Sequence, residues 1–166
     1  EAGVYEALDL RVAQHPSETL PYLITRLIAF SLEYTEGLAF SKGLCVPDEP
    51  AVWAHDQTGR LITWVEVGQP SAERLHKASK RAESVVVYTH RDPELIHRDA
   101  RSTRVHQAER IMVTAIESSL LEAVEPTIER DNTWSLVASE GQLYLSIGDV
   151  HASSALMPRA LGATIG

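Results

Sequence analysis

The spacing of apolar residues along the chain predicts alternating strands and helices. Apolar positions between Leu20 and Leu32 recur at helical spacing, and Ser17 before them is a suitable N-cap, so we expect a helix that ends near Thr35. The stretch before it, YEALDLRVAQHP, alternates apolar and polar residues. This alternation predicts a strand that leads into an amphipathic helix.

A hairpin and a strand–helix–strand unit follow in the pattern. Residues 51–68 are typical of a β-hairpin with DQTG as its turn, and the second arm, RLITWVEVG, is rich in β-branched and aromatic residues. Ser71 can cap a helix over residues 72–83, and the apolar run SVVVYTH after it is typical of a strand buried on both faces. Such a unit has a right-handed connection in nearly all proteins.

The second half of the chain continues this alternation. The pattern predicts a helix over residues 92–103, a strand at RIMVTAI and a helix over residues 118–129. TWSLVA and QLYLSIG, joined by a turn at residues 139–141, predict a C-terminal β-hairpin.

Length and composition fit one compact domain. The 166 residues are 44% hydrophobic and 23% charged, which is ordinary for a globular protein. We therefore expect a single α/β domain over residues 1–166, with a mixed β-sheet flanked by helices and a trailing segment at residues 151–166. No apolar run is long enough to span a membrane. The single cysteine, Cys45, rules out an internal disulfide and favours a cytoplasmic location.

Charge is distributed unevenly along the chain. The net charge is −8, unlike that of a typical nucleic-acid-binding protein. Between Arg74 and Arg110, however, nine Lys or Arg residues stand against five Asp or Glu residues, with four His residues among them. The rest of the chain holds six basic and eighteen acidic residues. This distribution predicts either a locally basic face or two ordinary solvated helix faces.

Asp48 and Glu66 are the candidate metal ligands. Each lies nine positions from Gln57, the expected centre of the hairpin turn, so the two carboxylates would be cross-strand neighbours if the first arm stays extended. A turn displaced by one residue would place Glu49 there instead. Like charges this close repel each other, and a divalent cation such as Mg²⁺, a shared proton or solvent would each relieve the repulsion. Ordinary surface carboxylates on a hairpin are the alternative.

Six short motifs resemble the YaeQ family of bacterial proteins. They are HPSET (15–19), RLIAF (26–30), KGL (42–44), DEP (48–50) with Trp53, WVEVGQP (64–70) and RLHKA (74–78). The resemblance covers nearly the whole chain and implies a compact relative of the PD-(D/E)XK nuclease fold. It also implies a strand before YEALDL, and hence an amino end that is truncated or disordered here.

The resemblance assigns roles to particular residues. In the PD-(D/E)XK superfamily two acids on adjacent strands hold a divalent cation, which here would be Asp48 and Glu66 with Mg²⁺ or Mn²⁺. Glu18 would take the place of an accessory acid. The superfamily's lysine, two positions after the second acid, is replaced by Gly68. The resemblance points to Lys77 as its substitute.

The helix after Gly68 leaves the choice of this basic group open. A helical wheel places one apolar stripe on its buried side, formed by Ala72, Leu75, Ala78 and Ala82. Lys77 lies nearly opposite that stripe, although a long lysine stem can curl back toward a site. Arg74, which flanks the stripe, and Gln69, as an amide substitute, are the alternatives.

The leading functional hypothesis is metal-dependent hydrolysis of phosphodiester bonds in nucleic acid. A bound Mg²⁺ neutralises charge on the phosphoryl oxygens and lowers the pKa of its water, and the segment Arg74–Arg110 would contact the nucleic acid. The alternative is a binding or regulatory module that keeps the fold without catalysis, and an unrelated enzyme that uses the same cleft is a third hypothesis. Arg26 is either a buried partner for an acid of the site or a charge on a helix face.

Overall fold

The computed structural model describes residues 13–42 and 48–164. Its larger sheet has six strands in the order β1–β2–β3–β4–β5–β9. They are β1 (Leu38–Phe40), β2 (Val52–His55), β3 (Leu61–Val67), β4 (Ser84–Thr89), β5 (Met112–Ala115) and β9 (Arg159–Ala160). The central strands β3, β4 and β5 are parallel, whereas every other neighbouring pair is antiparallel. The prediction of a mixed sheet in an α/β fold is therefore confirmed.

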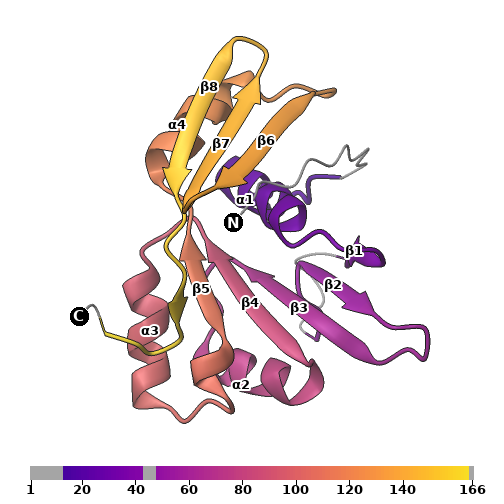
Figure 1. Ribbon diagram of the computed structural model, residues 1–166, viewed down its shortest axis with the longest axis vertical. Coiled ribbons are helices and arrows are strands. Elements are labelled where there is room, and N and C mark those ends of the chain that lie inside the picture. Colours follow the sequence, from indigo (N-terminus) through magenta and orange to yellow (C-terminus); the bar gives the residue numbers. More distant parts are fainter. Residues whose placement is uncertain (1–12, 43–47, 165–166) are drawn as a thin grey trace.

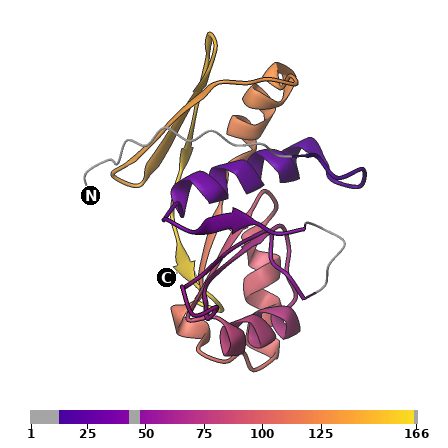
Figure 2. The same ribbon diagram turned by 90° about the vertical axis from the view of Figure 1, so that its right-hand side faces the viewer.

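Helices cover both faces of this sheet. The α-helices of the described residues are α1 (Leu20–Leu32), α2 (Ala72–Arg81), α3 (Pro93–Ser102) and α4 (Ser118–Val124), with 3₁₀ turns at Ala108–Arg110 and Glu125–Thr127. The first helix lies on one face and the pair α2 and α3 on the other (Figures 1 and 2). No helix of the described residues is both long and apolar enough to cross a membrane.

A second, antiparallel sheet lies beyond α1. Its strands are β6 (Trp134–Ser139), β7 (Gln142–Ile147) and β8 (Val150–Ala155). The predicted C-terminal hairpin is present as β6 and β7, and β8 is the third strand of this sheet. The expectation that residues 151–166 form a trailing segment was wrong. This segment forms most of β8 and then returns as β9, which pairs with β5. The strand β8 (VHASSA) has little apolar character and β9 has two residues, so neither carries a clear periodic signal.

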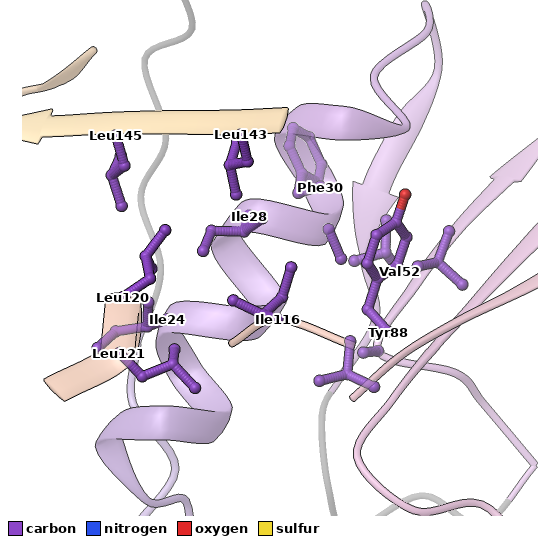
Figure 3. Packing of buried hydrophobic residues seen from close by; sticks show 14 of the residues in the cluster. Ile24, Ile28, Phe30, Val52, Tyr88, Ile116, Leu120, Leu121, Leu143 and Leu145 are labelled. Carbon is purple, nitrogen blue, oxygen red and sulfur yellow. The ribbon is translucent and has the colours of Figure 1, made fainter. Parts of the chain in front are cut away.

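The first helix joins the two sheets through one apolar core. In Figure 3, Ile24 and Ile28 of α1 lie between Leu143 and Leu145 of β7 on one side and the larger sheet, marked by Val52 and Tyr88, on the other. All of these side chains are buried. This explains why α1 is apolar around much of its circumference.

A second core lies under α2 and α3. Leu75 of α2 and Ile96 of α3 pack in it with Val87 of β4 and Val113 of β5. The predicted buried stripe of α2 is confirmed, because the exposed fractions of Ala72, Leu75 and Ala78 are 2%, 0% and 1%. The opposite side of α2 is consequently free to carry charge.

Helix capping was predicted with mixed success. Ser71 caps α2, since its side chain accepts a hydrogen bond from the N–H of Arg74 at 3.1 Å. The first helix, however, is capped by Thr19 and not by Ser17, whose hydroxyl contacts His15 Nδ1 at 2.8 Å. The helix predicted over residues 118–129 is shorter than expected, because its α-helical part ends at Val124. The strand expected around residues 8–12, and Cys45, lie outside the described residues.

Candidate functional site

The hairpin register decides where Asp48 lies relative to Glu66. The turn is where the sequence predicted it, with the Gly59 N–H donating to the Asp56 carbonyl at 3.0 Å. The strands pair Val52 with Val65, however, so Glu66 lies level with Ala51. The prediction that Asp48 is the cross-strand neighbour of Glu66 was therefore wrong. The pair His55–Leu61 already centres the hairpin on residue 58 instead of 57, and a register shift between Ala54 and His55 displaces the pairing by one further residue.

Glu66 is a buried acid in an ion pair with Arg74. It lies next to the last residue of β3 and is 4% exposed. Arg74, in the first turn of α2, donates from Nε to one carboxylate oxygen and from Nη2 to the other at 3.1 Å. Burial raises the pKa of Glu66, while the hydrogen bond and charge of Arg74 oppose that rise. The carboxylate is thus neutralised by a guanidinium from the following helix.

The same arginine reaches the turn that carries Asp48. Arg74 Nη2 donates to the Glu49 carbonyl at 2.6 Å, and Arg81 Nη1 donates to the Asp48 carbonyl at 2.7 Å. The two guanidinium carbons lie 5.8 and 5.1 Å from the ring centroid of Trp64, a cation–π arrangement. Two arginines of α2 thereby attach the 48–49 turn to the sheet.

Arg74 is ion-paired with Glu66 and feels the charge of Asp48 only as a weaker electrostatic effect. Burial lowers the pKa of Arg74, but the hydrogen bond and charge of Glu66 outweigh it and raise that pKa overall, with a smaller contribution from Asp48. The Asp48 residue itself is exposed. Arg74 therefore neutralises Glu66, a role that the sequence analysis did not consider, whereas Asp48 is not the adjacent acid that the sequence predicted.

Glu18 is also engaged by an arginine. Its Oε2 accepts from Arg26 Nε at 2.9 Å, and its Oε1 accepts from Arg26 Nη2 at 2.9 Å and from the His15 N–H at 3.0 Å. The side chains of Glu18 and Arg26 are only 1% and 8% exposed. The interpretation of Arg26 as a buried partner for an acid is confirmed.

Tyr22 lies between the two ion pairs. Burial raises the pKa of its phenol to about 12, and the negative charges of Glu66 and Glu18 add to this rise. Its ring also contacts His90, with ring centroids 6.3 Å apart. Nothing in the spacing of apolar residues distinguished Tyr22 from an ordinary helix residue, so sequence analysis missed it.

The packing of Tyr22 explains why position 68 is glycine. Gly68 has a φ of +102°, and a Cβ atom there would lie 3.1 Å from a ring carbon of Tyr22. Both the backbone conformation and the close ring exclude a lysine side chain without local rearrangement. The departure from the PD-(D/E)XK pattern at this position is built into the packing.

The other candidate basic and polar groups face solvent. Lys77 has a side chain that is 72% exposed and pairs with Glu73 at 3.1 Å on the outer side of α2. Gln69 is exposed in the loop between β3 and α2. Arg74 is thus the residue that the structure joins to Glu66, whereas Lys77 pairs with Glu73 at the surface, away from the buried stripe of α2.

The side chains do not fit a resident Mg²⁺ or Mn²⁺ in this arrangement. Among residues 13–42 and 48–164, no group of three or more His, Cys, Asp or Glu residues is arranged to hold a metal ion. Both oxygens of Glu66 and both oxygens of Glu18 accept hydrogen bonds from arginine. A cation would have to displace a guanidinium before it could bind either acid.

The fold and this pair of buried Glu–Arg contacts define a mixed α/β protein with a charged site between α1, β3 and α2. The family model described as YaeQ protein matches residues 1–156, so the chain belongs to the YaeQ family. The family resemblance seen in the short motifs is thereby confirmed.

Individual relatives support this assignment. The chain is 29% identical over 139 residues to the uncharacterized protein YaeQ of Escherichia coli strain K12. This alignment covers 83% of this chain and 77% of the relative. It resembles the crystal structure of the YaeQ protein from Pseudomonas syringae with a TM-score of 0.84 and 29% identity, covering 93% and 86% of the two chains. The YaeQ protein from Xanthomonas axonopodis pv. citri gives a TM-score of 0.79 and 31% identity, with coverage of 97% and 90%.

Proposed function

We propose that this protein is a non-catalytic nucleic-acid-binding module on a PD-(D/E)XK-like core. The observation that carries the proposal is the contact of Arg74 with Glu66, because it places a side-chain cation where a nuclease of that class needs a divalent one. The succession of α1, the hairpin β2–β3, α2 and the parallel strand β4 supports such a core.

Two features argue against hydrolysis. The first is that Glu66 is already neutralised by Arg74, so a metal would have to compete with a charge-assisted, double hydrogen bond in a buried position. The second is Gly68, where Tyr22 and the backbone leave no room for the lysine that positions water in active relatives of the fold. Without a metal and that lysine, the charge that develops in phosphodiester hydrolysis is not stabilised.

The outer surface of α2 and α3 supports binding to nucleic acid. The two helices share one core and lie side by side on the larger sheet (Figure 1). Their exposed basic residues, together with those of the segment that follows α3, are Lys77, Lys80, Arg81, Arg98, Arg101, Arg104 and Arg110. Basic side chains on a surface bind phosphates by displacing counterions and do not need to read base sequence.

Fluorescence anisotropy tests the binding. Labelled 20-nucleotide single-stranded and duplex DNA and RNA would be titrated with the protein at several salt concentrations. We expect affinity that falls with salt, and variants Lys80→Glu and Arg98→Glu that bind more weakly, each reducing the slope of log K against log salt by about 0.7–0.9. Arg130→Glu, an equal charge change at an exposed position outside α2 and α3, should reduce the slope less than either variant. Absence of binding at low salt, or equal losses in all three variants, would contradict the proposal.

A cleavage assay tests the non-catalytic part separately. Wild type and Glu66→Gln would be incubated with the same nucleic acids in Mg²⁺ and in Mn²⁺, and Mn²⁺ binding would be measured by calorimetry. We expect no cleavage and no binding of Mn²⁺ that depends on Glu66. Cleavage by the wild type that is lost in Glu66→Gln would establish the enzyme hypothesis instead.

A further inference from the structure

The segment after β8 is fastened across the edge of the larger sheet. Residues 159–163, here called the C-terminal strap, begin with β9, which pairs with β5 as the last strand of that sheet. The Leu161 N–H donates to the Ile111 carbonyl at 2.8 Å, and the Leu161 side chain is 5% exposed in the core under α3. The strap therefore covers the edge of β5 and buries an apolar side chain of its own.

One buried histidine holds the strap to α3. His97 is 1% exposed, and its Nδ1 accepts a hydrogen bond from the Gly162 N–H at 3.0 Å. An acceptor at Nδ1 carries no proton, so the proton of the neutral ring resides on Nε2. The Nε2 atom is buried and has no hydrogen-bond partner among the described residues. The observed contact thus requires neutral His97.

Charged groups around His97 oppose its protonation. The groups that face it are Glu94 and Arg101 of α3 and Arg159 of β9. Glu94 pairs with Arg159, and Arg101 lies 3.9 Å from the same carboxylate. Burial lowers the pKa of His97, Arg159 and Arg101 lower it further, and Glu94 partly opposes them. The hydrogen bond from Arg159 also lowers the pKa of Glu94, so this acid stays ionised near neutral pH.

Arg101 of α3 and Arg159 of the strap itself both donate hydrogen bonds to strap carbonyls. Arg101 Nη1 donates to the Gly162 carbonyl at 3.3 Å, and Arg159 Nη2 donates to the Ala163 carbonyl at 2.9 Å. A proton on His97 Nδ1 would face the Gly162 N–H, remove the acceptor of that hydrogen bond and add a third positive charge to one carboxylate. Local release of the strap separates these groups and lets the imidazolium reach water.

We propose that the C-terminal strap is a proton-operated latch, closed while His97 is neutral and released from α3 and β5 when His97 is protonated. Release exposes the outer edge of β5, whose free N–H and C=O groups can pair with another extended segment. The device is independent of nucleic-acid binding.

The sign of the pH dependence follows from the two states. In the open state His97 titrates near its ordinary value of 6.5, whereas its pKa is lower in the closed state. The open state therefore binds more protons as the pH falls below about 6.5, and the closed state loses stability over that range and keeps it above. One proton corresponds to a loss of at most about tenfold in closed population per pH unit.

Amide hydrogen exchange measures the latch directly. Exchange at the amides of Leu161 and Gly162 would be followed from pH 7.5 to pH 5.0 in the full chain, with correction for the intrinsic pH dependence of exchange. We expect their protection to fall by up to about tenfold per pH unit below 6.5. Amides in the centre of β4, such as that of Val87, should keep their protection.

Two variants assign the effect to His97. In His97→Asn the side-chain oxygen can still accept from Gly162 but does not titrate, so protection of the strap should become independent of pH. His106→Asn, at an exposed histidine, should respond as the wild type does. If His97→Asn does not fold, the ¹⁵N shifts of the wild-type ring give the second measurement, and we expect an Nε2–H tautomer whose titration coincides with loss of strap protection. Two results would overturn the proposal: strap protection in the wild type that does not change with pH, or an equal loss of strap protection at low pH in a folded His97→Asn variant.

Discussion

Two buried Glu–Arg pairs flank Tyr22. One of them is a structural contact, whereas the other can rearrange. In each pair the residues are eight positions apart, Glu18 with Arg26 and Glu66 with Arg74, and the arginine comes from the helix that follows the acid. The side chain of Arg26 is 8% exposed, whereas that of Arg74 is 30% exposed. The first pair is sealed and the second is open to water on one side.

The partners of the two arginines differ in the same way. Arg26 Nη2 also donates to the Ala13 carbonyl at 3.2 Å, close in the chain to Glu18, so the first pair organises one local segment. Arg74 connects β3 and α2, which are neighbours in sequence, to the 48–49 turn, whose Glu49 lies 25 residues earlier in the chain. The second pair is consequently the one whose rearrangement would move several elements at once.

The largest effect is expected from breaking the sealed pair. Arg26→Met leaves the buried charge of Glu18 uncompensated and should lower the free energy of unfolding by about 3–5 kcal/mol. Urea denaturation measures this loss. The double variant Glu18→Gln/Arg26→Met should recover a large part of it, and no recovery would show that packing of Arg26, and not its charge, is what matters.

The open pair should be less costly to break. In Arg74→Met water can reach Glu66, so we expect a loss of about 1–3 kcal/mol in the free energy of unfolding. Lys77→Met is a matched control on the same helix, because its exposed contact with Glu73 should contribute no more than about 0.5 kcal/mol. A loss for Arg74→Met that exceeds the loss for Arg26→Met would reverse the comparison.

Substitution of Gly68, the glycine beside the open pair, should have an intermediate to small effect on the free energy of unfolding. Gly68→Ala combines a positive φ with a methyl group 3.1 Å from Tyr22, and we expect a loss of more than about 1 kcal/mol in urea denaturation. Gly59→Ala has a similar φ of +87° but open space around the new methyl group. The difference between the two variants measures the steric cost against Tyr22, and equal losses would contradict a tight fit there.

The smallest effect at neutral pH concerns the ionisation of Tyr22. Ultraviolet difference absorbance should detect a phenol with a pKa of about 12 that is missing in Tyr22→Phe. The unfolded phenol ionises near 10, so this group contributes stability that is present below pH 10 and is lost as the pH rises toward 12. Glu66→Gln should lower the Tyr22 pKa because it removes a negative charge. An unchanged Tyr22 pKa in that variant would separate Tyr22 from the open pair.

Local structure was largely predictable from the chain. The hairpin turn at DQTG, the Ser71 cap and the buried stripe of α2 depend on contacts between residues near each other in sequence, and all three were predicted correctly. The exposed position of Lys77 follows from the same helical wheel. Arg81 also carried a signal, since it lies seven residues after Arg74 and hence on the same face two turns along the helix.

The arrangement of the candidate residues was less predictable, since Lys77 and Gln69 lie exposed and Tyr22 was missed. The sequence identified Glu66, Asp48, Glu18 and Arg74 as candidates, but it placed the two principal acids opposite each other in the hairpin. Glu66 lies level with Ala51 instead, because the hairpin is centred on residue 58 at the pair His55–Leu61 and a register shift between Ala54 and His55 adds one further residue. A pattern of alternating residues does not reveal such a shift, because a local irregularity changes the pairing without changing the periodicity.

The amino-acid sequence by itself determined the YaeQ family, the mixed α/β elements and the set of ionisable residues, since each is recorded in short-range order along the chain. Only the tertiary structure decided that an arginine faces Glu66, that Tyr22 occupies the space beside Gly68, and that residues 159–160 return to pair with β5. The reason is physical: the charge state and partner of a buried group depend on which distant segments remove water from it, and that is set by packing in three dimensions.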